Sequence, residues 1–172
     1  MKTFRHLMGL AFVLSSVLLT AGLALAASLS KPEGRPILEV SGSISTTNVG
    51  DKAQFDIAML EKMKPAKVAT STAWTEGTPV FEGVLMRDLL AAVGAKGDTV
   101  TAVALNDYKI DIPIADFMKY PVVLAFRQDG QLLKVREKGP LWIVYPQDEF
   151  TELKNKQTQA KWLWQLKELR VK

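Results

Sequence analysis

The stretch VVLAFRQDGQLLKVREKGPLWIVYP, residues 122–146, decides the fold because it predicts a run of β-strands. Val122 to Phe126 and Leu132 to Val135 flank the pair Asp129-Gly130. Such a pair between apolar runs is a strong short-range signal of a β-hairpin. Leu141 to Tyr145 lies between two prolines and predicts a buried strand. An antiparallel hairpin followed by another strand favours a sheet that is largely antiparallel.

Outward from this stretch, the pattern predicts further strands and two helices. Asp56 is placed to cap a short helix that runs through Met63. A second helix is expected from about Val84, with Gly94 at its C-terminal end. No glycine-rich turn connects a strand to a helix, so a doubly wound fold is not favoured. We therefore expect an α+β fold, with a mixed, mainly antiparallel sheet and a few short helices. Further strands are expected at residues 37–42, 66–70, 99–105 and 162–171.

The N-terminus has the pattern of a signal peptide. Lys2 and Arg5 precede an uncharged run from Leu7 to Leu23, and Ala24-Leu25-Ala26 supplies small residues for a cleavage site. An uncleaved membrane anchor is the alternative. The small residues and the absence of a nearby second basic flank favour cleavage. We expect a signal peptide at 1–26, a short polar lead-in at 27–36 and a single domain at 37–172.

The composition excludes several chemistries for the exported domain. The chain has no cysteine, and its single histidine is His6, inside the leader. Catalysis by a serine or cysteine with a histidine base is therefore excluded, as are disulfides and the usual zinc, haem and iron–sulfur sites. Without the leader, 20 basic residues face 18 acidic ones, so no nucleic-acid partner is expected. The functions that remain are carboxylate, lysine or tyrosine chemistry, an oxygen-ligated metal, or binding without catalysis.

A polar loop after the strand at 66–70 is the first candidate site. Thr70 and Thr72 supply hydroxyls, Trp74 an indole and Glu76 a carboxylate. Loops held by a rigid strand end commonly carry binding residues. The alternative is a turn whose hydroxyls bond only to the local backbone. Of the tryptophans, Trp74 is the one expected to stack on a planar ring.

Two further turns are candidates. Asn106, Asp107 and Tyr108 follow the strand at 99–105, and a carboxylate there could accept two parallel N–H bonds. An ordinary Asx turn is the alternative.

Arg136 and Lys138 precede the strand at 141–145 and could meet a phosphate or carboxylate. A solvated turn is the alternative.

The two tryptophans near the C-terminus are expected to pack rather than to bind. Trp162 and Trp164 alternate along the predicted strand at 162–171, so they would share one face of it. Large aromatic side chains in that arrangement most often fill a core or an interface.

These segments in this order resemble the molybdopterin-binding oxidoreductase domain, which is the catalytic-domain fold of sulfite oxidase and of periplasmic methionine-sulfoxide reductases. Each segment is a weak signal, whereas the ordered set covers nearly the whole exported chain. The resemblance implies a sulfite-oxidase-like fold. The segments are 38–42, 73–74, 81–85, 88–90, 104–108, 112–113, 120–121, 129–130, 138–146 and 164–166.

The sequence departs from the family pattern at the position that would bind the metal. Catalytic members place a molybdenum-ligating cysteine at the end of the strand before the Ala-Trp turn, and here that place falls at Thr70. A protonated hydroxyl is a far poorer ligand than a thiolate. The resemblance therefore implies no redox cofactor, argues against molybdopterin, and leaves a pterin as the ligand.

The resemblance also implies a role. Small periplasmic members that lack the cysteine are pterin-responsive partners of membrane-bound enzymes that control cyclic-di-GMP. We therefore expect a periplasmic, non-catalytic pterin-binding protein that signals to the periplasmic domain of a membrane receptor, such as a cyclic-di-GMP enzyme or sensor kinase. Two alternatives stay open. One is a molybdopterin-dependent oxidoreductase with a non-cysteine metal ligand, and the other is a structural adaptor with a vestigial pocket.

Within that role, each candidate residue has an expected part. Trp74 would stack on the pterin, and Asp107 or Glu76 would accept hydrogen bonds from its amino-pyrimidine edge. Thr70, Thr72 and Asn106 would complete the polar shell beside Tyr108. Arg136 and Lys138 would approach a hydroxylated side chain or a phosphate.

Overall fold

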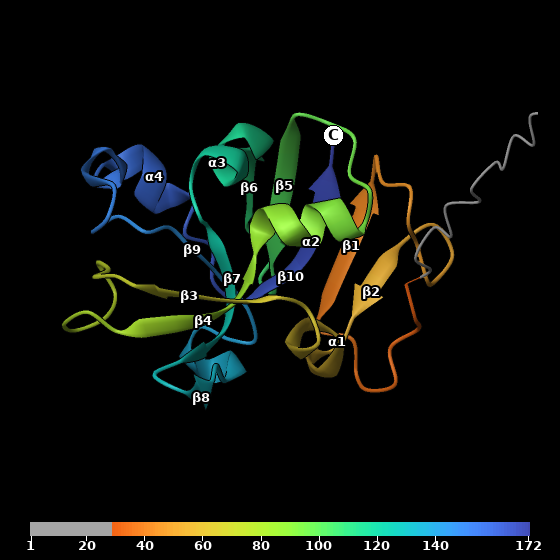
Figure 1. The fold of residues 1–172 in the computed structure, drawn as a ribbon, viewed down its shortest axis with the longest axis horizontal. Coiled ribbons are helices and arrows are strands. Elements are labelled where there is room, and N and C mark those ends of the chain that lie inside the picture. The colour runs from red at the N-terminus through yellow and green to blue at the C-terminus, as the bar shows by residue number, and fades with distance from the viewer. Residues whose placement is uncertain (1–28) are drawn as a thin grey trace, which may run out of the picture.

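A computed structural model describes residues 29–172, and the expected signal peptide at 1–26 lies outside the described residues. In the described part of the chain, no helix is long and apolar enough to cross a membrane. The strands form two five-stranded sheets (Figure 1). In the first sheet the order is β2 (Ala53–Phe55), β1 (Leu38–Gly42), β10 (Leu166–Val171), β5 (Thr99–Ala104) and β6 (Lys109–Pro113).

The second sheet contains the hairpin that the sequence predicts. Its order is β3 (Pro65–Ala69), β4 (Val80–Leu85), β7 (Val123–Gln128) and β8 (Gln131–Leu132), and β9 (Trp142–Val144) also pairs with β7. Asp129 and Gly130 both take positive φ angles, of 49° and 78°, as a tight hairpin turn requires. Across both sheets the pairing of β1 with β10 is parallel and the others are antiparallel. The expected α+β class with a mixed, mainly antiparallel arrangement is confirmed.

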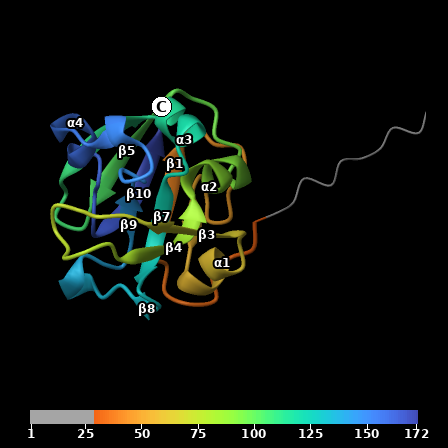
Figure 2. The same ribbon diagram turned by 60° about the vertical axis from the view of Figure 1, so that its left-hand side comes forward.

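Short helices connect the strands and cover the sheets. α4 and α1 lie far apart in both views (Figures 1 and 2), while α2 packs against α3 and β4. Asp56 caps α1 as expected, because its side chain accepts a 2.8 Å bond from the backbone N–H of Met59. The elements are α1 (Ile57–Glu61), α2 (Met86–Ala92), α3 (Ile114–Lys119) and α4 (Lys156–Ala160), with 3₁₀ turns η1 (Val135–Glu137) and η2 (Thr151–Leu153).

Backbone hydrogen bonds join the two sheets along one seam. The N–H of Ile143 in β9 donates to the carbonyl of Leu163 at 3.0 Å, and the N–H of Leu166 donates to Leu141 at 3.0 Å. β9 belongs to the second sheet, whereas residues 163–166 lead into β10 of the first. Leu141 and Ile143 on one side of this seam and Leu166 on the other are fully buried.

Several expected element boundaries differ from the structure. The helix expected to run through Met63 ends at Glu61. The helix expected from Val84 begins at Met86, because residues 80–85 pair with β3 and β7 on both sides. The second hairpin strand, expected at Leu132–Val135, is shorter because the carbonyl of Lys134 accepts bonds that close a turn. The tail strand, expected from residue 162, begins at Leu166 because Gln165 takes a φ of 52°. Strands β2, β4 and β6 and helices α3 and α4 were not expected.

Gly83 provides a test of the β4–β7 pairing. A Cβ added at this glycine would overlap the carbonyl oxygen of Leu124 on the facing strand, which is backbone and cannot swing away. We predict that Gly83→Ala lowers the free energy of unfolding by about 3 kcal/mol or more, because the added methyl group forces β4 away from β7. Urea unfolding monitored by tryptophan fluorescence measures this.

The matched control is Gly77→Ala. Gly77 has a φ of 64° and nothing within 4 Å of an added Cβ, so only backbone strain of about 1 kcal/mol is expected. Equal losses in the two variants would contradict the close approach of β4 to β7.

Candidate functional site

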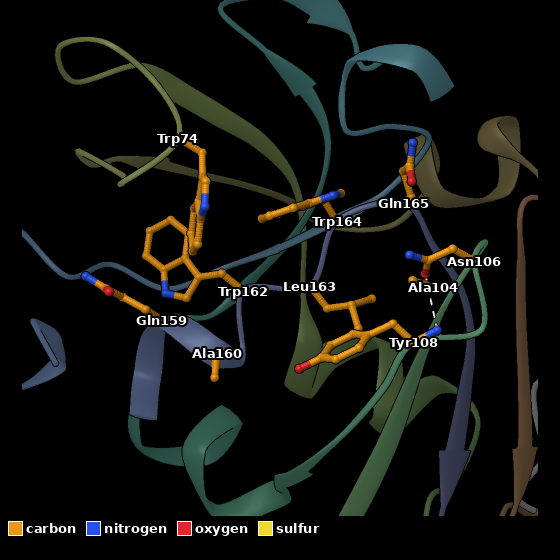
Figure 3. A pocket seen from close by; sticks show the side chains of 10 residues that line it. All are labelled: Trp74, Ala104, Asn106, Tyr108, Gln159, Ala160, Trp162, Leu163, Trp164 and Gln165. Carbon is orange, nitrogen blue, oxygen red and sulfur yellow. Dashed lines mark hydrogen bonds between the residues drawn. The ribbon is translucent and has the colours of Figure 1, made fainter. Parts of the chain in front are cut away.

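An aromatic cavity of about 300 Å³ opens between the turn that carries Trp74 and the turn that carries Tyr108 (Figure 3). Trp74 and Trp162 form one side of it, and Tyr108 lies across from them with Leu163. Trp164 lies between the two sides. The cavity thus joins segments that are far apart in the sequence.

The four tryptophans form one cluster, which the sequence did not predict. Trp74 contacts Trp164 edge-to-face with ring centroids 5.1 Å apart, and it lies 6.1 Å from Trp162 and 6.3 Å from Trp142. Such geometry is the favoured one for aromatic pairs and stabilises them beyond simple burial. The indole of Trp74 is therefore held in place by three others. Trp162 and Trp164 precede β10, so the expectation that they share one face of that strand is wrong.

A buried donor remains unpaired in the cavity wall. The Nε1 atoms of Trp142 and Trp162 are buried and have no acceptor among the described residues. An unsatisfied buried N–H costs about 1–3 kcal/mol. This indole N–H is itself buried, so it is a cost to the folded state and is not open to a molecule in the cavity.

A polar network supports Trp162 from behind. Its ring stacks on Tyr145 with centroids 6.4 Å apart, and the Tyr145 hydroxyl donates to Asp116 at 3.1 Å. Lys161 pairs with the same carboxylate at 2.6 Å. Burial and the neighbouring Asp116 carboxylate raise the pKa of Tyr145, so its hydroxyl remains a donor at neutral pH. This network fixes the orientation of one cavity wall.

Asp148 anchors the loop that carries Trp74. Its carboxylate accepts bonds from the Ser71 backbone N–H at 2.6 Å and from the Ser71 hydroxyl at 2.9 Å. Lys154 pairs with it at 2.8 Å. The Lys154 ammonium and the two Ser71 donors lower the pKa of Asp148 to about 2. Gln147 adds a 2.8 Å bond to the Ser71 carbonyl. The loop is therefore attached to the segment that follows β9.

Thr70, which the resemblance places where a metal ligand would lie, has a hydroxyl that is already bonded within the protein. It is fully buried, and its hydroxyl donates to the Ser71 carbonyl at 3.4 Å and accepts from the Asp148 N–H at 3.3 Å. It does not line the cavity. In the described part of the chain, no group of three or more His, Cys, Asp or Glu side chains could hold a metal ion. These residues do not fit a molybdenum centre.

The turn at residues 106–108 contributes two of its three expected residues to the cavity. Asn106 and Tyr108 line it, and the Asn106 side chain accepts from the Tyr108 backbone N–H at 3.2 Å, as in an Asx turn. Asp107 has a φ of 65° and pairs with Lys167 at 2.7 Å, outside the lining. That ion pair lowers the pKa of Asp107.

The remaining candidates lie outside the cavity lining. Thr72 bonds to Thr75 at 2.8 Å and accepts from the backbone N–H of Trp74, which shapes the loop locally. Glu76 is exposed. Arg136 is exposed beside Glu137, and Lys138 places its ammonium 5.8 Å from the ring centroid of Trp142.

Sequence reasoning missed two amides at the cavity, Gln159 and Gln165. Gln159 belongs to α4, a helix whose five residues carry no apolar periodicity. Gln165 has a positive φ angle, which only tertiary contacts explain. The segment at residues 164–166, the last of those that resemble the family, was the one signal in the sequence that pointed to the Gln165 side of the cavity.

The two sheets, their seam and the aromatic cavity define an α+β domain with a preformed site between loop turns. The family profile of the oxidoreductase molybdopterin binding domain matches residues 49–170, which is more than half of the chain. The chain belongs to this family. A search of curated proteins found no match.

Asp148→Asn tests the loop anchor. In the folded protein the pKa of Asp148 lies below its ordinary value near 4, so its stabilisation is complete above that pH and is lost as the pH falls towards about 2. We predict that the variant is less stable at pH 7 by about 1 kcal/mol, because partial exposure screens the charges. Its stability should also vary less between pH 4 and pH 2. Thermal unfolding across this pH range measures both effects.

The control is Glu149→Gln, an exposed neighbour. It should follow the wild type at every pH. An Asp148→Asn variant with unchanged pH dependence would show that this carboxylate does not anchor the loop.

Proposed function

We propose that this protein binds a pterin, or a similar flat heterocycle, in the aromatic cavity without a redox metal. In this proposal it signals occupancy to the periplasmic domain of a membrane receptor, such as a cyclic-di-GMP enzyme or sensor kinase. The observation that carries the proposal is the cavity itself. It lies between the two turns that the sequence singled out, and tryptophan and tyrosine rings form its sides.

The shape and chemistry of the walls suit a planar ring. Trp74 and Trp162 on one side and Tyr108 on the other offer aromatic surfaces to a flat molecule. Stacking of a base-like ring on an aromatic side chain contributes about 1–3 kcal/mol.

The polar groups at the cavity favour an uncharged ligand. Asn106, Gln159 and Gln165 each carry a carboxamide, which donates and accepts, as the edge of an amino-pyrimidinone requires. Among residues 29–172, no charged side chain lines the cavity. Burying a phosphate against such walls is costly because nothing neutralises it. The proposed ligand is therefore a pterin without phosphate, and Arg136 and Lys138 have no direct part in holding it.

The absence of a fitting metal ligand supports binding over redox catalysis. Thr70 is buried beneath the loop with its hydroxyl engaged by Ser71 and Asp148. The chain has no cysteine that could replace it. A signalling role then requires that a partner bind the occupied and empty forms with different affinity. The loop turns that form the cavity also reach the surface, so a ligand could change what a partner meets there.

Removal of the ring surfaces tests the site. We predict that Trp74→Ala and Tyr108→Ala each weaken the binding of neopterin at least about tenfold, because each removes one stacking surface. Isothermal titration calorimetry on the purified exported chain measures the dissociation constants. The control is Met118→Ala, which alters an exposed side chain on α3 that does not line the cavity.

A phosphate on the ligand should weaken binding. We predict that neopterin monophosphate binds at least about tenfold more weakly than neopterin, because its charge would be desolvated among uncharged amides. A competition titration between the two compares them directly. Tighter binding of the phosphorylated compound would contradict the assignment of the carboxamides as the polar edge of the site.

Two results would overturn the proposed function. The first is the lack of any pterin in protein isolated from the periplasm, together with no rise in melting temperature on adding pterins. The second is molybdenum at one atom per chain in protein matured in a host that makes the cofactor.

A further inference from the structure

Exposed apolar side chains occur on two segments that are both hydrogen-bonded to Gln165, a residue of the cavity lining. Six large apolar side chains are exposed in the described part of the chain, and four of them fall within residues 105–108 and 132–135. Soluble proteins rarely group exposed apolar side chains without a binding role. We call residues 105–109 and 132–138 the cavity rim. The four side chains and their exposed fractions are Leu105 42%, Tyr108 53%, Leu132 47% and Val135 53%.

Gln165 joins the two segments of the rim to the cavity. Its carbonyl accepts from the Leu105 N–H at 2.8 Å, its backbone N–H donates to the Lys138 carbonyl at 3.0 Å, and its side-chain amide donates to the Val135 carbonyl at 2.7 Å. Gln165 also lines the cavity (Figure 3). One residue therefore contacts the ligand site and fixes both surface segments.

The charges around the rim define the kind of surface that it fits. Around the rim, lysine and arginine side chains outnumber carboxylates. Among the side chains that form ion pairs there, that of Arg136 is the most exposed, at 79%. A second copy of this chain would bring like charges together, which disfavours association through this face. An acidic surface is complementary. The cations are Lys109, Lys134, Arg136, Lys138 and Lys167, and the carboxylates are Asp107 and Glu137.

We propose that the cavity rim is a docking surface for a partner protein whose soluble domain presents an apolar patch with an acidic border. The partner then lies over the cavity mouth, and Tyr108 contacts both the cavity and the partner. The dependence of docking on ligand rests on the proposed function, whereas the docking surface itself does not.

Site-specific photocrosslinking in the protein's own host tests the docking surface. A photoreactive phenylalanine is placed at Leu105 or Val135 of the full chain, and at Met118 as the exposed apolar control. Leu105 and Val135 do not line the cavity, so these variants keep the ligand site. We expect both rim positions to crosslink the same protein, through peptides rich in Asp and Glu, with at least a tenfold lower yield at Met118.

Charge reversal supplies the second arm. Lys134→Glu with Arg136→Glu should lower the crosslinking yield from Leu105 at least tenfold, while Lys62→Glu with Lys64→Glu, near α1, should leave it unchanged. The proposal is overturned if the rim crosslinks chiefly a second copy of this chain, or if reversal has no effect. It is also overturned if the wild type sediments with phosphatidylglycerol vesicles and the reversal abolishes that binding, because the rim would then be a membrane surface.

Addition of neopterin separates this proposal from the proposed function. A several-fold change in the crosslinking yield from the Leu105 position, absent when Trp74→Ala is added to the same variant, supports docking that depends on the ligand, because Trp74 lines the cavity and lies outside the rim. Rim-specific crosslinking that neopterin does not alter would keep the docking surface and overturn the signalling function.

Discussion

The backbone seam between β9 and residues 163–166 is the contact on which the rest of the structure depends. Two hydrogen bonds, from Ile143 to Leu163 and from Leu166 to Leu141, join strands that belong to different sheets. Because they fix the register of the two segments, Trp142 is brought beside Trp162 and Trp164. Trp74 then packs on all three from a loop of the second sheet. The aromatic cavity is therefore a direct consequence of how the sheets meet.

The same arrangement explains how a family cleft can persist without its metal ligand. Asp148, just beyond β9, binds Ser71 and thereby positions the loop from Thr70 to Trp74. The loop needs no metal to hold it, because a carboxylate, a lysine and a buried hydroxyl supply the attachment. The anchored loop and the Gln165 turn create the surfaces at which we propose that a heterocycle binds and a partner docks.

Local signals in the sequence predicted those features that depend on neighbouring residues. The Asp129-Gly130 turn, the Asp56 cap and the strand at Thr99–Ala104 need only short-range chemistry, and all three are present. The helix expected from about Val84 is present but begins at Met86, because residues 80–85 pair with β3 and β7. Pairing with distant strands overrides the helical periodicity of a short segment.

By itself, the sequence determined the chemistry that this protein lacks and the class of its fold. The absence of cysteine excludes thiolate sites whatever the structure, because no fold can supply a missing atom, and His6 is the single imidazole of the chain. Only the tertiary structure decided which side chains form the cavity. Trp74, Tyr108, Gln159 and Gln165 belong to four separate segments, and only the pairing of the strands and the packing between the two sheets bring them together.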